Sequence, residues 1–217
     1  MNEYTPQKKR LQLSFLINLI IVIMEIITLA MSASNYGFTL FRFYTEDSNI
    51  FALIACSLCA YYSLKCLKGH SSAIPLWVKT AKYMATCCLT VTFVVVVCVL
   101  APTAGPGGYQ MMLLQGSMLV HHFLGPVLAF ISFVFLEKEP LLPKKYSFYA
   151  LIPTLIYAVI ILILNISHLI VGPYPFLHVY EQPVYITILW CIIIIGGAYI
   201  FTILLRHLNH MGTKKSQ

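Results

Sequence analysis

Long apolar runs separated by short polar segments dominate the pattern along the chain. Each run has roughly the 20 residues that an α-helix needs to cross a bilayer core of about 30 Å. None of them alternates in the way that the strands of a membrane barrel do. The pattern predicts an all-α, polytopic membrane protein with six transmembrane helices in one bundle. The expected spans cover residues 11–33, 48–67, 77–101, 111–136, 148–171 and 183–205.

These spans use most of the 217 residues, so we expect a single transmembrane domain over residues 1–217. Lys8, Lys9 and Arg10 precede the first run, as basic residues precede the apolar core of a signal peptide. That core has only about 7–15 residues, however, and the first run here is longer and contains Glu25. We therefore expect the first run to be a retained helix.

Composition agrees with a membrane location. Hydrophobic residues make up 59% of the chain and charged residues 10%, whereas soluble domains have about 45–50% and about 25%. These values exclude a soluble enzyme, a disordered regulator and a nucleic-acid-binding domain. Membrane lipids are the expected partners, and nothing indicates a protein partner, a cofactor or a metal site.

The basic residues predict the orientation. If the spans alternate in direction, thirteen of the fourteen Lys and Arg residues fall on one face of the membrane and only Arg42 falls on the other. Cytoplasmic loops carry such an excess of basic residues, so both termini are expected in the cytoplasm, and the protein is expected in the cell membrane. The thirteen are Lys8, Lys9, Arg10, Lys65, Lys68, Lys79, Lys82, Lys138, Lys144, Lys145, Arg206, Lys214 and Lys215.

Polar residues are expected at similar heights in several spans. At about 1.5 Å per residue, the estimated heights above the cytoplasmic charges are roughly 22–24 Å for Glu25, Asn49, His121 and His122, roughly 30 Å for Thr45 and roughly 34 Å for His168. The inner halves of the helices are expected to be almost purely Ile, Leu, Val and Phe. If helices one, two, four and five face a common interior, these groups converge on a pocket open to the outer leaflet.

Thr45 and Asn49 lie one turn apart where the second span begins. One interpretation makes Thr45 an N-cap or turn residue, whose side-chain oxygen accepts a hydrogen bond from a free backbone N–H. The other makes Thr45 a nucleophile and Asn49 a donor to the oxyanion, since residues four apart share a helix face. The sequence leaves both interpretations open.

The fourth span contains a histidine pair followed by Gly125 and Pro126. Proline cannot donate to the carbonyl four residues back, which belongs to His122, so the helix should kink at the pair. A buried neutral imidazole is a good general base. Because His121 and His122 point about 100° apart on a helix, we expect at most one of them to face a reactive group. The alternative is a packing histidine bonded to a helix carbonyl.

The remaining candidates lie near the outer ends of the helices. His168 is expected to end the fifth span, either at the pocket or as an interfacial residue. The Pro-rich segment 172–177 should form a loop or lid, with Tyr174 and Phe176 in the interfacial aromatic belt. Glu25 could orient a histidine or carry a proton, because an ionisable group inside a membrane is by default functional, or it could simply stay protonated in the core. Trp190 is expected to pack.

These features together resemble the androgen-induced-gene type of integral membrane proteins. The similarity rests on six spans with both ends inside, an aromatic-Thr motif opening helix two, a His-x₄-Pro element in helix four and a Tyr-Pro-Phe-Leu loop before helix six. The stretch from Phe43 to Asn49 is most similar to the bacterial branch. The resemblance implies a threonine hydrolase, since the eukaryotic members hydrolyse fatty acid esters of hydroxy fatty acids.

Carried over by position, Thr45 matches the nucleophilic threonine of that family. The base of that family is a histidine at a fixed distance before a proline. The distance in the eukaryotic members matches His121, and the distance in the bacterial members matches His122. Tyr174, Pro175 and Phe176 match the loop motif. The segment after Thr45 is acidic here, whereas eukaryotic members are more apolar at this place. Because of this departure, the resemblance does not fix the substrate.

The resulting hypothesis is an intramembrane lipid-ester hydrolase with its site toward the extracytoplasmic side. Thr45 would attack the ester, His122 or His121 would act as base, and Asn49 or backbone N–H groups would stabilise the oxyanion. Glu25, His168, Tyr174 and Phe176 would complete the pocket. Two alternatives remain: a haem-binding redox protein with His122 and His168 as ligands, and a small lipid or proton-coupled transporter using Glu25. Against them stand a height difference of about 12 Å and an expected lack of polar groups in the cytoplasmic half.

Overall fold

A computed structural model describes residues 4–138 and 142–211, without the side chains of residues 4–6. Lys214 and Lys215, which entered the orientation argument, lie outside the described residues. The described part of the chain contains helices and no strand, and six of its helical stretches are long and apolar enough to cross a membrane. The predicted all-α, multi-pass membrane fold is confirmed. The six stretches are Gln7–Arg42, Tyr44–Leu67, Leu76–Thr103, Gly116–Leu136, Lys145–Ile166 and Val184–His210.

Several crossings are built from more than one kind of helix. The first consists of α1 (Tyr4–Tyr36) and the 3-10 helix η1 (Gly37–Arg42), and the second is α2 (Tyr44–Leu67). The third runs through α3 (Leu76–Val95), η2 (Val96–Leu100) and α4 (Ala101–Thr103). After α5 (Gly108–Leu114), the fourth combines α6 (Gly116–Leu119), η3 (Val120–Leu124), α7 (Gly125–Ile131) and η4 (Ser132–Leu136). The last two are α8 (Lys145–Ile166) and α9 (Val184–His210), with η5 (Pro175–Leu177) between them.

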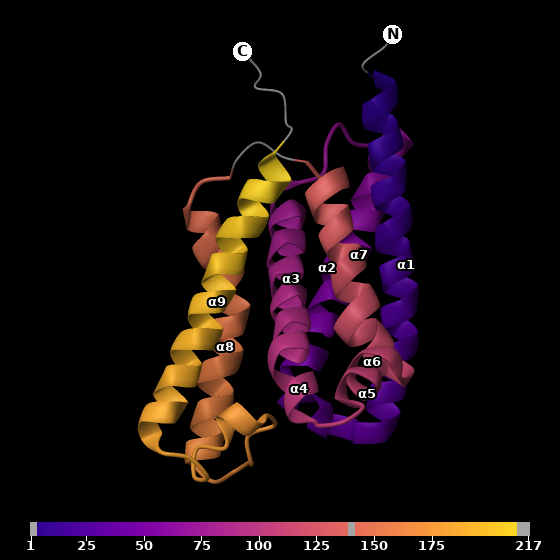
Figure 1. Cartoon of the computed structure of the whole chain (residues 1–217). Coiled ribbons are helices and arrows are strands. Elements are labelled where there is room, and N and C mark those ends of the chain that lie inside the picture. Colours follow the sequence, from indigo (N-terminus) through magenta and orange to yellow (C-terminus); the bar gives the residue numbers. More distant parts are fainter. Residues whose placement is uncertain (1–3, 139–141, 212–217) are drawn as a thin grey trace.

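Helix α3 lies at the centre of the bundle. It packs against α2 and α7 on one side and against α8 and α9 on the other (Figure 1). Helix α1 covers α2 and α7 on the far side from α9 (Figure 1). The start of α1 and the end of α9 lie at the same end of the bundle, and we call the opposite end, where α4 and α5 lie, the distal end (Figure 1). The basic-residue pattern predicts that the distal end faces away from the cytoplasm.

Helix α1 turns a polar stripe toward the bundle. Its buried residues recur every three or four positions, which places them on one face of the helix, and only Ile21 among them is apolar. The lipid-facing side carries Leu and Ile instead, so the helix remains apolar on average. The buried residues of this stripe are Ser14, Asn18, Ile21, Glu25, Thr28 and Ser32.

The half of the bundle near the termini contains a polar network. Glu137 Oε1 accepts hydrogen bonds from Ser14 at 2.9 Å, from Asn18 at 2.7 Å and from Ser132 at 2.6 Å. Lys82 Nζ donates to Asn18 Oδ1 at 2.6 Å and is buried rather than placed at the membrane edge. The expectation that the inner halves are almost purely apolar is therefore wrong. Average hydropathy conceals polar residues that share one helix face.

The fourth crossing begins at Gly116 rather than near residue 111. Gln115 is extended, with φ −110° and ψ 132°, and Gly116 has φ +52°, which glycine adopts without steric cost. These two residues break the apolar run, so α5 is a separate short helix at the distal end (Figure 1).

The fifth crossing ends at Ile166, five residues earlier than expected. His168 has φ +57°, its N–H donates to the Asn165 carbonyl, and the Leu169 N–H donates to the Leu164 carbonyl. This pair of hydrogen bonds around a left-handed residue is the Schellman helix end. The residues after it form the distal loop instead of another helical turn.

Candidate active site

Thr45 lies in the first turn of α2, at the distal end. The N-cap of this helix is Phe43, whose side chain makes no capping hydrogen bond. Thr45 therefore does not act as the N-cap, and its hydroxyl is available for another partner. The side chain is buried.

The histidine pair lies in a π-helical turn, η3. Pro126 has no N–H, and the Gly125 N–H donates to the Val120 carbonyl five residues back. Where the sequence predicts a kink, the structure has a widened turn. Such π-bulges are frequent at functional sites. Here the turn presents His121 and His122 to different neighbours.

His122 faces Thr45. Its Nε2 lies 3.2 Å from Thr45 Oγ1, and its Nδ1 lies 2.7 Å from the carbonyl oxygen of Met112 in α5. A carbonyl oxygen only accepts hydrogen bonds, so Nδ1 carries the proton and Nε2 is left as the acceptor. The Thr45 hydroxyl then donates to Nε2, which is the arrangement of a nucleophile and its general base.

His121 points to two carboxyl groups instead. Its Nε2 lies 3.4 Å from Glu25 Oε2, and its Nδ1 lies 3.4 Å from Glu46 Oε1, which also accepts a hydrogen bond from Ser32 at 3.0 Å. Of the two candidate bases, the structure brings His122 rather than His121 to the Thr45 hydroxyl. Glu25 lies beside His121.

Asn49 is occupied by the backbone. Its Nδ2 donates to the Thr45 carbonyl at 2.8 Å and to the His121 carbonyl at 3.3 Å. Because both bonds hold the amide against main-chain oxygens, Asn49 ties α2 to η3 and does not present a donor beside the Thr45 hydroxyl. The free N–H groups in the first turn of α2 remain as oxyanion donors.

The distal loop brings Tyr174 to the same place. The Thr45 N–H donates to Tyr174 Oη at 3.5 Å, and the Tyr174 ring stacks on Phe176 at 5.2 Å between centroids. Asn165 Nδ2 donates to the Leu177 carbonyl and fixes this loop against the end of α8. Burial raises the pKa of the Tyr174 phenol, so the phenol keeps its proton and can donate a hydrogen bond.

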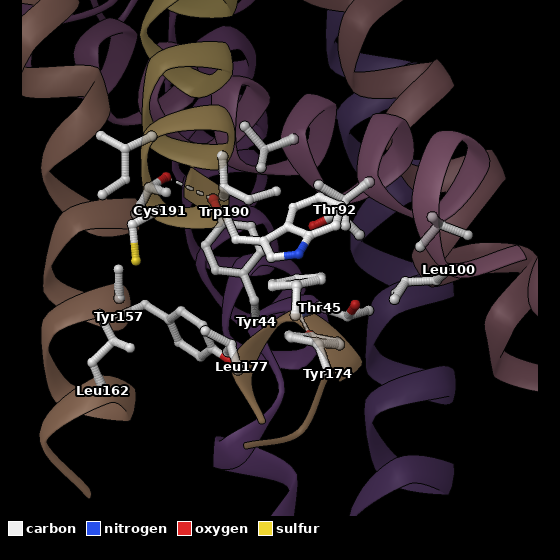
Figure 2. A pocket seen from close by; sticks show the side chains of 18 residues that line it. Tyr44, Thr45, Thr92, Leu100, Tyr157, Leu162, Tyr174, Leu177, Trp190 and Cys191 are labelled. Atoms are coloured by element: carbon white, nitrogen blue, oxygen red, sulfur yellow. Dashed lines mark hydrogen bonds between the residues drawn. The ribbon is translucent and has the colours of Figure 1, made fainter. Parts of the chain in front are cut away.

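A cavity lies beside Thr45 (Figure 2). It lies between α2, α3, α8 and α9, and the distal loop contributes Tyr174 and Phe176. Most of its lining side chains are apolar, and Thr45 is one of the few polar ones, as in ligand pockets generally. The lining residues are Tyr44, Thr45, Val91, Thr92, Val95, Val96, Leu100, Thr154, Tyr157, Ala158, Leu162, Tyr174, Phe176, Leu177, Trp190, Cys191, Ile194 and Ile195.

A second cavity lies between α2, α3 and α8. Tyr44 and Tyr157 line both cavities and meet edge to face, 5.1 Å apart. Tyr44 Oη is 2.7 Å from Thr154 Oγ1, and Tyr157 Oη donates to the Arg42 carbonyl at 2.7 Å. These two tyrosines therefore form a partition between the cavities.

His168 is not part of the cluster. It is exposed after α8, stacks on Tyr180 at 4.2 Å and lines neither cavity. The left-handed helix end turns His168 away from the bundle. Helix α8 contributes Thr154 and Tyr157 to the pocket in its place. The structure does not bring together the His122 and His168 pair that the haem alternative requires.

Sequence reasoning missed several residues of the site. The Met112 carbonyl that orients His122 carries no side-chain signal, and Trp190 was expected only to pack, although it lines the cavity. The spacing of Thr154 and Tyr157 indicates their place only weakly. Polar residues three positions apart on an apolar helix tend to lie on the face that is turned toward the bundle.

Comparison of the chain with models of known protein families, with curated proteins and with solved structures gave no match. The resemblance drawn from the three short motifs therefore stays a prediction.

Proposed function

We propose that the protein is an intramembrane hydrolase of lipid esters, with Thr45 as nucleophile and His122 as general base. One observation carries the proposal. The Thr45 hydroxyl faces the free Nε2 of His122, whose other nitrogen is fixed by the Met112 carbonyl, and Thr45 lies in the wall of an apolar cavity.

The reaction would proceed through an acyl-enzyme. Thr45 Oγ1 attacks the ester carbonyl while its proton passes to His122 Nε2. His122 then returns this proton to the departing alkoxide, which leaves as an alcohol and leaves an acyl ester on Thr45. In the second half, His122 takes a proton from water, the hydroxide attacks the acyl carbonyl, and the proton returns to Thr45 as the fatty acid departs.

Two donors are available to the oxyanion. The side chain of the N-cap Phe43 does not occupy the N–H groups in the first turn of α2, and a helix N-terminus favours negative charge. The Tyr174 phenol lies against the Thr45 N–H and retains its proton. Preorganised donors of this kind act strongly in a site that excludes water.

The apolar lining favours a hydrocarbon chain as the part of the substrate that is bound. Val95, Leu100, Leu162 and Ile194 belong to this lining (Leu100 and Leu162 are labelled in Figure 2). A substrate that partitions into the bilayer would reach the cavity between helices, and membrane lipids are the source of such esters.

A fluorophosphonate probe tests the nucleophile. We expect the purified protein to be labelled, with one phosphonyl group on the peptide that contains Thr45. Thr45→Ala and His122→Ala should lose the labelling, whereas Thr45→Ser should keep it because serine retains the hydroxyl.

Thr92→Ala is the matched control. Thr92 lines the same cavity, but its hydroxyl lies 2.9 Å from Ser48 Oγ and is not bonded to a histidine. This variant should be labelled like the wild type. Undiminished labelling of folded Thr45→Ala would overturn the proposed mechanism.

A further inference from the structure

Glu25, His121 and Glu46 form a second polar cluster, which the proposed hydrolysis does not use. Their side chains are 0%, 0% and 3% exposed. Within the described part of the chain, both carboxyl oxygens of Glu25, both ring nitrogens of His121 and Glu46 Oε2 have no hydrogen-bond partner. The imidazole lies between the two carboxyl groups, 3.4 Å from an oxygen of each.

Among the described residues, no lysine or arginine compensates these carboxyl groups. In the described residues, neither glutamate forms an ion pair with a lysine or an arginine. Lys82 bonds to Asn18, which lies two helical turns from Glu25 along α1. From residue 7 onward, the other titratable groups on α1, η1, α2, α3 and η3 are Lys8, Lys9, Arg10, Tyr36, Arg42, Tyr44, Asp47, Cys56, Cys59, Tyr61, Tyr62, Lys65, Cys66, Lys79, Lys82, Tyr83, Cys87, Cys88 and His122.

Charge balance then requires protons. With both carboxylates ionised and the imidazole neutral, the core of the bundle would carry two uncompensated negative charges, which is very costly in a membrane. One proton on His121 and one on a carboxyl group make the cluster neutral. No group of three or more His, Cys, Asp or Glu side chains among the described residues has an arrangement suited to a metal ion. We propose that Glu25, His121 and Glu46 form a proton-binding site.

The site is closed toward the termini and connected toward the distal end. An apolar layer of buried side chains separates it from Asn18 and Lys82, and this layer consists of Ile21, Ala52, Ala55, Cys56, Ala85, Leu89 and Ala129. On the other side, Ser32 donates to Glu46, and the adjacent Asp47 is partly exposed in the wall of the second cavity. Protons therefore exchange with the distal face.

This proposal does not depend on the hydrolase proposal. Neither Glu25 nor His121 is hydrogen-bonded to the Thr45 hydroxyl in the described part of the chain, and this hydroxyl is bonded to His122. A protein without hydrolase activity would retain the proton site, and Thr45→Ala should leave its titration unchanged.

Infrared titration of the protein in phosphatidylcholine bilayers tests the site. A protonated carboxyl group has a C=O stretch that an ionised carboxylate lacks. We expect the wild type to show such a band, which shifts in heavy water and disappears as the pH rises. Glu25→Gln and Glu46→Gln should each alter or remove it, whereas Glu181→Gln should not, because Glu181 is an exposed carboxyl group in the distal loop.

His121→Asn provides a second variant. Removal of an imidazolium between two carboxyl groups favours their protonated forms, so the band should disappear at a pH higher by about one unit or more, a tenfold change in proton affinity. The absence of any titrating carboxylic-acid band in the folded wild type would overturn the proposal without reference to the variants. An identical band in wild type and in both glutamine variants would also overturn it.

The face from which protons reach the site is tested in vesicles that contain the protein in one orientation. An acid pulse in an impermeant buffer should change the band when it reaches the distal face and not when it reaches the face with the termini. The reverse result would overturn the distal connection.

Discussion

At the scale of single residues, the site depends on which atom of each side chain is free. His122 has one nitrogen bonded to a backbone carbonyl and the other directed at a hydroxyl, whereas the neighbouring His121 lies between two carboxyl groups. Two adjacent histidines thus have different chemistry because different partners fix their protons. The same reasoning separates Tyr174, whose phenol lies against Thr45, from Tyr180, the other tyrosine of the distal loop.

Tyr174→Phe should lower the rate of probe labelling and of ester hydrolysis by about 10²-fold, because removal of one oxyanion donor costs about this much. The ring stack on Phe176 is retained in this variant, so a role limited to packing would leave the rate unchanged. Tyr180→Phe is the control, since its hydroxyl bonds the Ile166 carbonyl in the same loop region. The measurement is the second-order rate constant of labelling.

At the scale of elements, the widened turn η3 determines where both histidines point. Pro126 removes one backbone donor, and Gly125 permits the close approach of α1 to this turn. A Cβ at Gly125 would lie 2.9 Å from Glu25 Oε1 and 3.0 Å from the Val120 carbonyl. Gly125 and Pro126 therefore serve both the Thr45–His122 pair, which we call the dyad, and the proton-binding site.

Gly125→Ala should lower stability by about 1–3 kcal/mol, the usual cost of overpacking, and should reduce labelling of Thr45 because η3 is displaced. Gly197→Ala is the matched control, because an added Cβ there meets no atom within 4 Å. Alanine is favoured over glycine in a helix, so Gly197→Ala should be neutral or stabilising. Thermal unfolding in detergent measures the stability of both variants. An equal change in stability for Gly125→Ala and Gly197→Ala would contradict the packing argument.

At the scale of the whole molecule, the cavity lies where two groups of helices meet. Helix α3 separates α1, α2 and α7 from the pair α8 and α9 (Figure 1), and the larger part of the apolar lining comes from α3, η2, α8 and α9. The nucleophile and its base, by contrast, come from α2 and η3. The proposed chemistry therefore depends on how these two groups are held together.

Ala158→Phe should fill part of the cavity, because Ala158 lines it on α8. We expect labelling by a long-chain fluorophosphonate to fall at least tenfold more than labelling by a short-chain one. Val159→Phe is the control, since Val159 faces outward and is 54% exposed. Equal loss with both probes would show that the cavity does not hold the acyl chain.

The sequence by itself determined the six crossings and the place of the distorted turn at the histidine pair. These features follow from local causes: the length of apolar runs, the missing N–H of Pro126 and the cost of charge in lipid. It also identified Thr45, His121, His122 and Glu25 as unusual, because a polar residue in a transmembrane helix needs a partner.

Only the tertiary structure decided which partner each of them has. Met112 orients His122 from a short helix that the apolar run concealed, and Asn49 is occupied by backbone carbonyls. His168 is turned outward by a left-handed helix end. Hydropathy along the sequence measures how a residue contributes to crossing the membrane. The direction of a side chain depends instead on neighbours that are far away in sequence. The dyad and the proton-binding site therefore appear only after the helices are packed.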